Sequence, residues 1–540
     1  METMKRLFAL TLLLTIFVSC APTAAGMQLP AASPTVLPTS SSPTAIPHTW
    51  WRDAVFYEIF VRSFYDTNSD GIGDFNGVTQ KLDYLQSLGV NAIWLMPIQP
   101  SPSYHGYDVT DYYTVNPQYG TMDDFKRLLS EAHSRDMHVI IDLVLNHTSS
   151  QHPWFVEANS NPQSKYRNWY VWSDTDPGNG WHPGNGGYYF GLFCDCMPDL
   201  NYRNPEVTAE MEKMARFWLN DIGIDGFRVD AAKHLIEENG KTENAAATHE
   251  WLKGFYGAYK ANKPNAYAVG EVFGAGGLIA KTYTGQLDEV FNFELASGFV
   301  NSANGGSNSG VTSAIKLTLK DMPGGQYATF LTNHDQNRAM SLFNGKVEKA
   351  RVAASLLLTA PGTPFIYYGE EIGMEGQKPD EDIRLPMQWN SDALTAGFTT
   401  ATPWRAPGQN TLTSNVTNED KDPNSLLNHY RELITLRRGH PALQTGTLTL
   451  LETGNSAVYA ILRHEADETV MVVINLGSQP IRAYSLYLAG SNLTDGSYSM
   501  NVIFGTGNVP PLKISNGKFD AYQPRPELAP FETLVISMSR

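Results

Sequence analysis

Acidic residues that could act together in catalysis stand at the ends of separate short apolar segments. Asp230 ends GFRVD (226–230), Glu271 follows YAVG (267–270), and Asp335 follows FLTNH (330–334). Like-charged carboxylates repel one another, so a stable protein seldom gathers three of them without a use. Glycoside hydrolysis uses such a set: one carboxylate as nucleophile, one carboxylic acid of raised pKa, and further negative charge that orients the sugar. The pattern therefore indicates chemistry on a glycosidic bond.

Other polar residues accompany these acids. Arg228 lies two positions before Asp230, so alternation along a strand puts both on one face, with Phe227 and Val229 on the other. A guanidinium beside Asp230 would keep this carboxylate ionised, as a nucleophile requires. Asp142, at the end of a third segment, is interpreted as a buried hydrogen-bonding partner.

The elements that must position these residues alternate between short apolar runs and amphipathic stretches. Helical periodicity predicts helices such as 205–221 and 348–359 between most of the runs. Eight strands that alternate with helices predict a parallel (β/α)₈ TIM barrel, with its chemistry at the C-terminal strand ends. The expected strands are 55–60, 92–96, 138–145, 226–230, 267–271, 289–293, 328–332 and 364–368.

Two further regions flank or interrupt this barrel, which is assigned to residues 49–147 and 205–442. Residues 148–204, rich in Trp, Tyr, Gly and Asn, predict a small domain inserted after the third strand. Alternating segments at 457–462, 469–476 and 533–538 predict a C-terminal antiparallel β-sandwich over residues 443–540. The fold class is therefore α/β with two accessory domains.

The N-terminus has the features of a targeting segment. Lys5 and Arg6 precede an apolar run, 7–18, that leads to Val-Ser-Cys ending at Cys20. This ending is similar to a bacterial lipobox, so residues 1–20 are predicted to be a lipoprotein signal peptide; cleavage without lipidation is the alternative. Residues 21–48, rich in Pro, Ser and Thr, would form a linker. The protein is thus expected to be exported and either anchored at Cys20 or secreted.

Composition excludes other partner classes. The 540 residues carry a net charge of −16, which disfavours nucleic acid and anionic membrane surfaces. No apolar run after the N-terminus is long enough to span a bilayer.

One acidic segment has the ligand spacing of a calcium loop. DTNSDGIGD (66–74) places oxygen donors at alternate positions, with Gly71 at the turn. An acidic Asx-turn loop without metal is the alternative. The predicted ligands of a structural Ca²⁺ are Asp66, Asn68, Asp70, the Ile72 carbonyl and Asp74.

The remaining cysteines, Cys194 and Cys196, are only two positions apart. They are interpreted as small buried side chains or a labile local bridge, with no assigned function.

Several segments together resemble glycoside hydrolase family 13. DLVLNH (142–147), GFRVDAAKH (226–234), GEVF (270–273) and FLTNHD (330–335) are similar to its four signature regions, in the same order. HGYDVTDYY (105–113), MPDLN (197–201) and GTPFIYYGEE (362–371) agree with it. The resemblance extends from about residue 50 to the end.

The resemblance implies roles for individual residues. Asp230 would be the nucleophile, Glu271 the general acid and base, and Asp335 the stabiliser of the transition state. A further set would hold the glucose unit that is cleaved: His105, Tyr107, His147, Arg228 and His334. The resemblance also implies a second calcium, bound by Asn146, Asp199 and the His234 carbonyl.

Specificity markers point in two directions. Lys233-His234 resembles α-amylases, in which these residues contact the leaving-group side, whereas MPDLN and IRLPMQW (383–389) resemble oligo-1,6-glucosidases. The expected activity is that of a retaining α-amylase acting on α-1,4-glucans as a monomer. The alternatives are an exo-acting α-glucosidase, a cyclomaltodextrinase or maltogenic enzyme, and a non-catalytic glycan-binding or chaperone-like protein.

Overall fold

The structure, a computed structural model, describes residues 49–274, 276–322 and 324–540. The predicted signal peptide with Cys20 and the linker lie outside the described residues. Among the described residues, no helix combines the length and the apolar character that crossing a bilayer requires.

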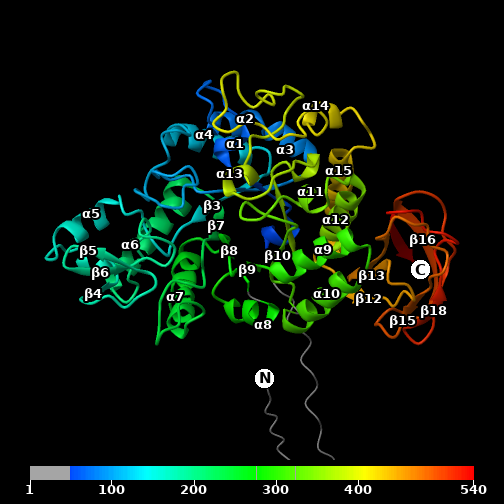
Figure 1. Cartoon of the computed structure of the whole chain (residues 1–540). Helices are drawn as coiled ribbons and strands as arrows, with labels where there is room; N and C mark the ends of the chain where they lie inside the picture. Colours follow the sequence, from blue (N-terminus) through cyan, green and yellow to red (C-terminus); the bar gives the residue numbers. More distant parts are fainter. Residues whose placement is uncertain (1–48, 275, 323) are drawn as a thin grey trace, which may run out of the picture. The chain divides into compact units, whose positions relative to one another are not determined.

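Eight parallel strands close into a barrel, which confirms the predicted fold class (Figure 1). Each strand pairs with its neighbours around the ring in the order β1-β11-β10-β9-β8-β7-β3-β2. The expected strands run too far at some C-terminal ends, because β3 stops at Leu143 and β10 at Thr329 where the chain bends into loops. The strands are β1 (Phe56–Ile59), β2 (Ala92–Leu95), β3 (His138–Leu143), β7 (Gly226–Val229), β8 (Tyr267–Gly270), β9 (Glu289–Phe291), β10 (Tyr327–Thr329) and β11 (Thr363–Tyr367).

Side chains alternate between the inside of the barrel and the layer beneath the helices. Phe227 and Val229 pack in the outer layer, as the alternation predicts. The interior is filled by aromatic rings, among them Trp94 and Phe56, whose ring lies 4.2 Å from that of Phe365. These rings fill much of the barrel interior, and the chemistry of such barrels lies at the C-terminal end.

Helices surround the barrel as an outer layer (Figure 1). Tertiary burial of one apolar face, rather than propensity alone, stabilises such helices. The predicted helix 205–221 ends earlier as α6, and a single π-helical turn, Phe217–Ile222, follows it. The helices are α1 (Val61–Phe64), α2 (Phe75–Gln80), α3 (Leu82–Leu88), α4 (Met122–His133), α6 (Pro205–Arg216), α7 (Ala246–Asn262), α8 (Gly277–Ala280), α9 (Phe293–Gly305), α10 (Ser309–Asp321), α11 (Ala339–Leu342), α12 (Val347–Thr359), α13 (Asp380–Ile383), α14 (Val416–Glu419), α15 (Leu426–Gly439) and α16 (Pro441–Gln444).

The segment between β3 and α6 forms the inserted unit at the left of Figure 1. It contains α5 (Pro153–Ser160) and a small sheet in the order β4-β6-β5, formed by β4 (Trp172–Ser173), β5 (Trp181–Gly184) and β6 (Gly187–Phe190). Its return path pairs with the barrel loop, because Leu200 N donates to Asn146 O at 2.9 Å. This pairing brings the MPDLN segment to the end of β3.

The C-terminal region forms antiparallel sheets over their own apolar core, as predicted. A six-stranded sheet has the order β12-β13-β14-β19-β16-β17, and β15 pairs with β18. Buried Arg463 joins this region to the barrel, since its Nη1 donates to Thr359 O at 2.8 Å. The strands are β12 (Thr447–Leu450), β13 (Val458–Glu465), β14 (Glu468–Asn475), β15 (Leu486–Leu488), β16 (Gly496–Phe504), β17 (Leu512–Ile514), β18 (Phe519–Tyr522) and β19 (Thr533–Ser539).

Candidate active site

The predicted nucleophile and acid stand immediately after adjacent barrel strands. β7 ends at Val229 and β8 at Gly270, so Asp230 and Glu271 are the first residues of the following loops, not the last of the strands. Their side chains remain 11% and 13% exposed, which leaves them accessible from the barrel mouth. Ala231 has a φ of +45°, and its N–H donates to Glu271 Oε2 at 3.2 Å. Local backbone strain thus accompanies the placement of Glu271.

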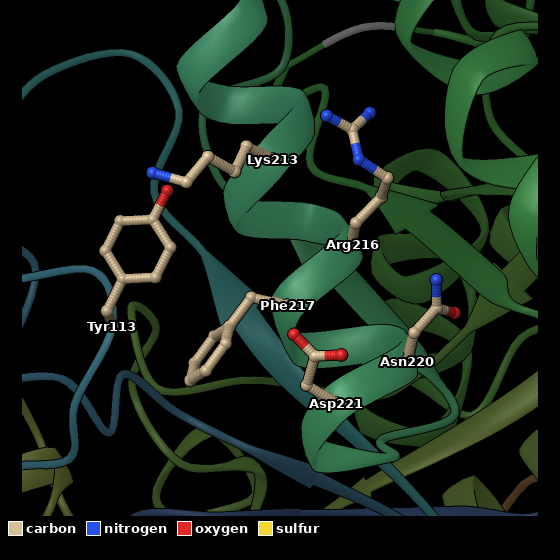
Figure 2. Close-up of a pocket in the computed structure, with 6 residues that line it drawn as sticks. All are labelled: Tyr113, Lys213, Arg216, Phe217, Asn220 and Asp221. Carbon is tan, nitrogen blue, oxygen red and sulfur yellow. The ribbon is translucent and has the colours of Figure 1, made fainter.

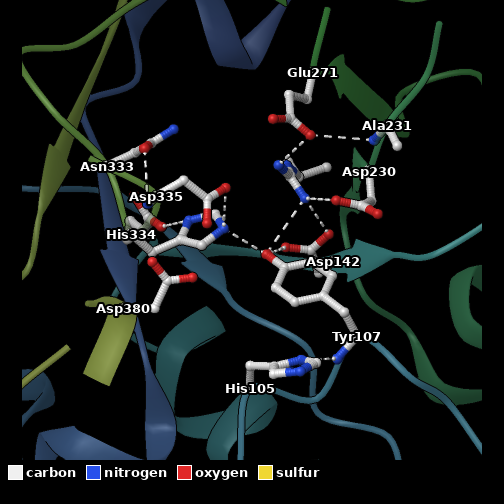
Figure 3. Close-up of polar contacts among 12 residues, drawn as sticks. His105, Tyr107, Asp142, Asp230, Ala231, Glu271, Asn333, His334, Asp335 and Asp380 are labelled. Atoms are coloured by element: carbon white, nitrogen blue, oxygen red, sulfur yellow. Dashed lines mark hydrogen bonds and ion pairs between the residues drawn. The ribbon is translucent and has the colours of Figure 1, made fainter. Parts of the chain in front are cut away.

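Arg228 contacts three carboxylates, those of Asp142, Asp230 and Glu271, which are labelled in Figure 3. Its Nη1 donates to Asp230 Oδ1 at 2.7 Å and to Asp142 Oδ1 at 2.9 Å. Its Nη2 lies 2.9 Å from Glu271 Oε2. One guanidinium, 1% exposed, therefore holds the predicted nucleophile and acid side by side. Asp142 has the buried, hydrogen-bonded environment that the sequence suggests.

The third acid, Asp335, is fixed by cations on the opposite side of the site. His334 Nε2 lies 3.1 Å from Asp335 Oδ2, and Arg384 Nη2 lies 2.9 Å from Asp335 Oδ1. His334 Nδ1 donates to Glu58 Oε1 at 2.5 Å. Burial by itself disfavours the charged forms of both His334 and Asp335. The ion pairs with Asp335 and Glu58 nevertheless raise the pKa of His334 to about 10, and His334 and Arg384 hold the pKa of Asp335 well below its usual range.

Sequence reasoning missed Glu58 and Arg384. Glu58 is a single charged residue in the apolar run VFYEIF, and alternation with buried Tyr57 and Ile59 would have pointed it into the barrel. Arg384 lies in IRLPMQW, a segment whose sequence indicates only substrate specificity. Arg384 comes from a segment about 50 residues after Asp335, and only the fold brings the two together.

The residues predicted to hold the glucose unit gather around the acids. Tyr107 OH lies 2.6 Å from His334 Nε2 and donates to Asp142 Oδ2 at 3.2 Å. His147 Nε2 bonds the carbonyl oxygen of Tyr107 at 3.2 Å, and His105 Nδ1 accepts from Tyr107 N at 3.1 Å. Burial lowers the pKa of His147 to about 4 and also lowers that of His105, so both rings are neutral hydrogen-bonding groups near pH 7.

The marker pair Lys233-His234 lies at the start of the loop after β7. Lys233 Nζ forms an ion pair with Glu243 Oε2 at 2.6 Å, and His234 Nδ1 bonds the carbonyl oxygen of Thr242 at 2.7 Å. The ring of Phe193, from the inserted unit, lies against His234 with 5.9 Å between ring centres. The inserted unit therefore reaches this side of the site.

The site contains more acids than cations. Arg228, His334 and Arg384 together contact six carboxyl groups, namely Glu58, Asp142, Asp230, Glu271, Asp335 and Asp380. Burial raises the pKa of Asp230 to about 8. The positive charge of Arg228 opposes this shift, and the nearby carboxylates add to it, namely Glu271, Asp142 and Asp335. Arg228 is thus present as predicted, but it does not outweigh burial in the free protein. At that pKa the Asp230 carboxyl carries a proton over most of the neutral pH range in the free protein.

A hollow beside Asp335 extends the site along α9. It is lined by Ser297, Val300, Asn301, Leu331, Thr332, Asp335, Gln336, Asn337, Leu342 and Lys378. These mixed polar and apolar side chains suit the hydroxyls and ring faces of a sugar.

A second hollow lies away from the predicted site residues. It is lined by Tyr113, Lys213, Arg216, Phe217, Asn220 and Asp221 around the π-helical turn (Figure 2). Tyr113 OH donates to Glu210 Oε1 at 2.6 Å, and Lys213 Nζ lies 3.2 Å from the same oxygen. Because these groups are already paired, we assign this hollow no role.

The predicted calcium loop, residues 66–74, has the internal hydrogen bonds of an acidic Asx-turn loop, which is the alternative interpretation. Asp66 Oδ1 accepts from Asn68 N and Ser69 N, and Asp74 accepts from Gly77 N as the cap of α2. Although the donors are the oxygens that Ca²⁺ prefers, the carboxylates of this described loop form no group of three with ligand atoms within 4.8 Å of one another. The oxygens would have to turn toward an ion, so the calcium at this loop stays a prediction.

The second predicted calcium site has unpartnered oxygens. Asn146 Nδ2 donates to Asp199 Oδ2 at 3.0 Å, while the buried Asn146 Oδ1 accepts no hydrogen bond from the described residues. Glu237 Oε1 is also buried without a partner among them. Burial and the nearby charge of Glu237 raise the pKa of Asp199 well above its usual range. These residues fit a cation.

Cys194 and Cys196 form a disulfide bond. Cys194 is half-buried and Cys196 exposed, so of the two interpretations the local bridge is right and the small buried side chains are wrong. The exposed turn between β6 and the MPDLN segment allows the thiols to meet.

Comparisons with known proteins agree with this geometry. Residues 58–446 match the family described as "Alpha amylase, catalytic domain". Alpha-amylase 3 of Dictyoglomus thermophilum is 44% identical over 437 residues, covering 79% of this chain and 85% of that protein. An oligo-1,6-glucosidase of Parageobacillus thermoglucosidasius is 35% identical, covering 80% of this chain and 91% of that protein. The crystal structure of an alpha-amylase from H. orenii is 39% identical with a TM-score of 0.78, covering 90% of this chain and 99% of that one.

Proposed function

Since the chain belongs to the α-amylase family, glycoside hydrolase family 13, and is an enzyme of α-glucosides, we propose that it is a retaining α-amylase that cleaves α-1,4 bonds within starch-like glucans. The observation that carries the proposal is the single guanidinium of Arg228 that holds Asp230 and Glu271 side by side. In retaining glycosidases, the nucleophile and the acid lie close together, whereas inverting enzymes leave room for a water between them.

In the proposed first step, the Asp230 carboxylate attacks the anomeric carbon while Glu271 gives its proton to the leaving glycosidic oxygen. Asp335, kept ionised by His334 and Arg384, stabilises the positive charge that develops on the sugar ring. In the second step, Glu271 removes a proton from water as the water oxygen attacks the anomeric carbon, and the bond between that carbon and the Asp230 carboxylate breaks. Only the ionised fraction of Asp230 can attack.

The endo-acting α-amylase is favoured by Lys233-His234 and by the similarity to Alpha-amylase 3. An oligo-1,6-glucosidase is the second candidate, supported by MPDLN, IRLPMQW and the similarity to the oligo-1,6-glucosidase. A non-catalytic glycan-binding or chaperone-like protein is disfavoured, because all three acids are present and lie around the same open site.

Product chromatography after digestion of soluble starch tests the proposal, with Glu271→Gln as the inactive control. We expect mixed maltooligosaccharides early in the digestion, and none from the variant. Glucose alone from the start, or activity only on isomaltose, would overturn the endo-amylase assignment in favour of the relatives.

Calcium and a membrane anchor complete the proposal. Asp66, Asn68, Asp70, Ile72 and Asp74 would hold one structural ion after a turn of their oxygens, and Asn146, Asp199 and the His234 carbonyl a second. Either ion would supply charge compensation that tethers loops to the barrel.

We also propose lipidation of Cys20, which would keep the enzyme at the outer face of a membrane. Incorporation of labelled palmitate that disappears in Cys20→Ser tests the anchor; equal release of both forms into the medium would contradict it.

A further inference from the structure

An exposed aromatic ring, that of Phe193, stands beside the site and directly precedes the disulfide between Cys194 and Cys196. Phe193 is 50% exposed, although apolar rings usually lie inside a protein. Its ring centre lies 5.3 Å from that of His147 and 5.9 Å from that of His234. His147 belongs with the residues around the glucose unit, and His234 with the leaving-group side. Phe193 therefore spans the boundary between the two sides.

The loop that carries Phe193 is anchored on both flanks. Leu192 N donates to Asp199 Oδ1 at 3.0 Å before the ring. After it, Ser150 N donates to Cys196 O at 2.8 Å, and Met197 N donates to Cys194 O at 3.2 Å. The disulfide between Cys194 and Cys196 closes the turn itself. A side chain held in this way keeps its exposed ring in place without the entropy cost of ordering it on binding.

The chemistry of the ring identifies the ligand. A phenyl face cannot donate or accept a strong hydrogen bond, but it can pack against the C–H face of a pyranose. Anionic ligands gain little from it, whereas a glucose unit gains contact area and specific geometry.

We propose that Phe193 is a sugar-binding residue that stacks on the glucose unit of the leaving group, and that the Cys194–Cys196 bridge positions it there. The inference deepens the proposed function and rests on it. The same ring would bind the incoming sugar when a glucan, rather than water, accepts the glycosyl group from Asp230. Phe193 would thereby set both the minimum chain length and the share of transfer products.

Two substrates separate this role from a structural one. Maltohexaose places glucose units on the leaving-group side, whereas α-maltosyl fluoride has only fluoride there and still requires Asp230. In Phe193→Ala, we expect kcat/KM for maltohexaose to fall about fivefold to tenfold, mainly through a higher KM, because one aromatic contact with the substrate is lost. Hydrolysis of α-maltosyl fluoride should stay within about twofold of wild type, and transfer to added maltose should decline.

Matched variants sharpen the test. Phe193→Trp keeps an aromatic face and should restore maltohexaose cleavage, and Leu394→Ala, which removes another exposed apolar side chain, should change neither substrate. The double variant Cys194→Ser/Cys196→Ser should show the Phe193→Ala pattern in weaker form. Equal losses on both substrates, or no loss on either, would overturn the proposal. If the wild-type enzyme prefers another α-glucoside, that substrate replaces maltohexaose and is again compared with a glycosyl fluoride. The comparison then tests Phe193 separately from the α-1,4 assignment.

Discussion

Replacing Arg228 by glutamine should deplete further the small ionised fraction of the nucleophile Asp230 near neutral pH. In the wild type, burial raises the pKa of Asp230 to about 8 even though Arg228 Nη1 lies 2.7 Å from Asp230 Oδ1. A unit charge at ~4 Å contributes about 4 kcal/mol at the effective dielectric of protein sites, which corresponds to roughly three pKa units. In Arg228→Gln the pKa of Asp230 should therefore move to on the order of 11.

The assay is the rate of α-maltosyl fluoride hydrolysis between pH 5 and 9, because fluoride departs without a proton from Glu271. At pH 7, the ionised fraction of Asp230, and with it kcat/KM, should fall about 10³-fold in the variant. The logarithm of the remaining rate should rise by about one for each pH unit across the range, because more Asp230 ionises as pH increases. Arg228→Lys keeps the charge, so its pH profile should stay near that of the wild type, although its rate is lower. A loss below tenfold in Arg228→Gln, or a rate independent of pH, would refute the reasoning.

Two further perturbations follow from the same site and from the acidic loop. Glu58→Gln removes a partner that helps to raise the pKa of His334 to about 10, so His334 should lose its proton at lower pH. The deficit in kcat/KM should then be larger at pH 9 than at pH 6, and an equal deficit at both would contradict this account. Chelation by EGTA should lower the melting temperature by about 3 °C, since a ligand at ~100 times its Kd contributes about 2.7 kcal/mol. Calcium should restore the loss in the wild type but only partly in Asp70→Asn, whereas an unchanged melting curve would argue against structural calcium.

Much of the fold was predictable because the patterns are local. The strands of the barrel are short runs with buried side chains on both faces, and the residues between them have helical periodicity. Sequence placed the strand ends less well. Asp230 and Glu271 were expected within strands, but each lies one position beyond, where the chain has already left the ladder of hydrogen bonds.

The site was predictable where motifs carry it and hidden where distant segments meet. Asp230, Glu271 and Asp335 follow apolar runs, so their convergence follows from the barrel. Glu58 adds a negative charge beside His334, and Arg384 adds a positive charge beside Asp335. Glu58 lies 276 residues before His334 in the sequence, and Arg384 lies 49 residues after Asp335. Their roles arise from the closure of the barrel and from the loop after β11, which single-sequence patterns do not encode.

The ionisation state of Asp230 also could not be predicted from the sequence alone. A guanidinium next to Asp230 suggested an ionised nucleophile, yet the same guanidinium serves Asp142 and Glu271. Burial and these neighbouring acids together raise the pKa of Asp230, and this effect depends on distances that spacing along the chain does not determine.

Covalent trapping tests the central claim most directly. The Glu271→Gln enzyme is incubated with a 5-fluoro-α-glucosyl fluoride, whose excellent leaving group permits attack while the variant cannot activate water. Mass spectrometry of the peptic digest should locate a 5-fluoroglucosyl ester on the peptide that contains Asp230, and Asp230→Asn should show none. A label on another carboxylate, or no label while the wild type hydrolyses the same reagent, would contradict the assignment of Asp230 as the nucleophile of a retaining enzyme.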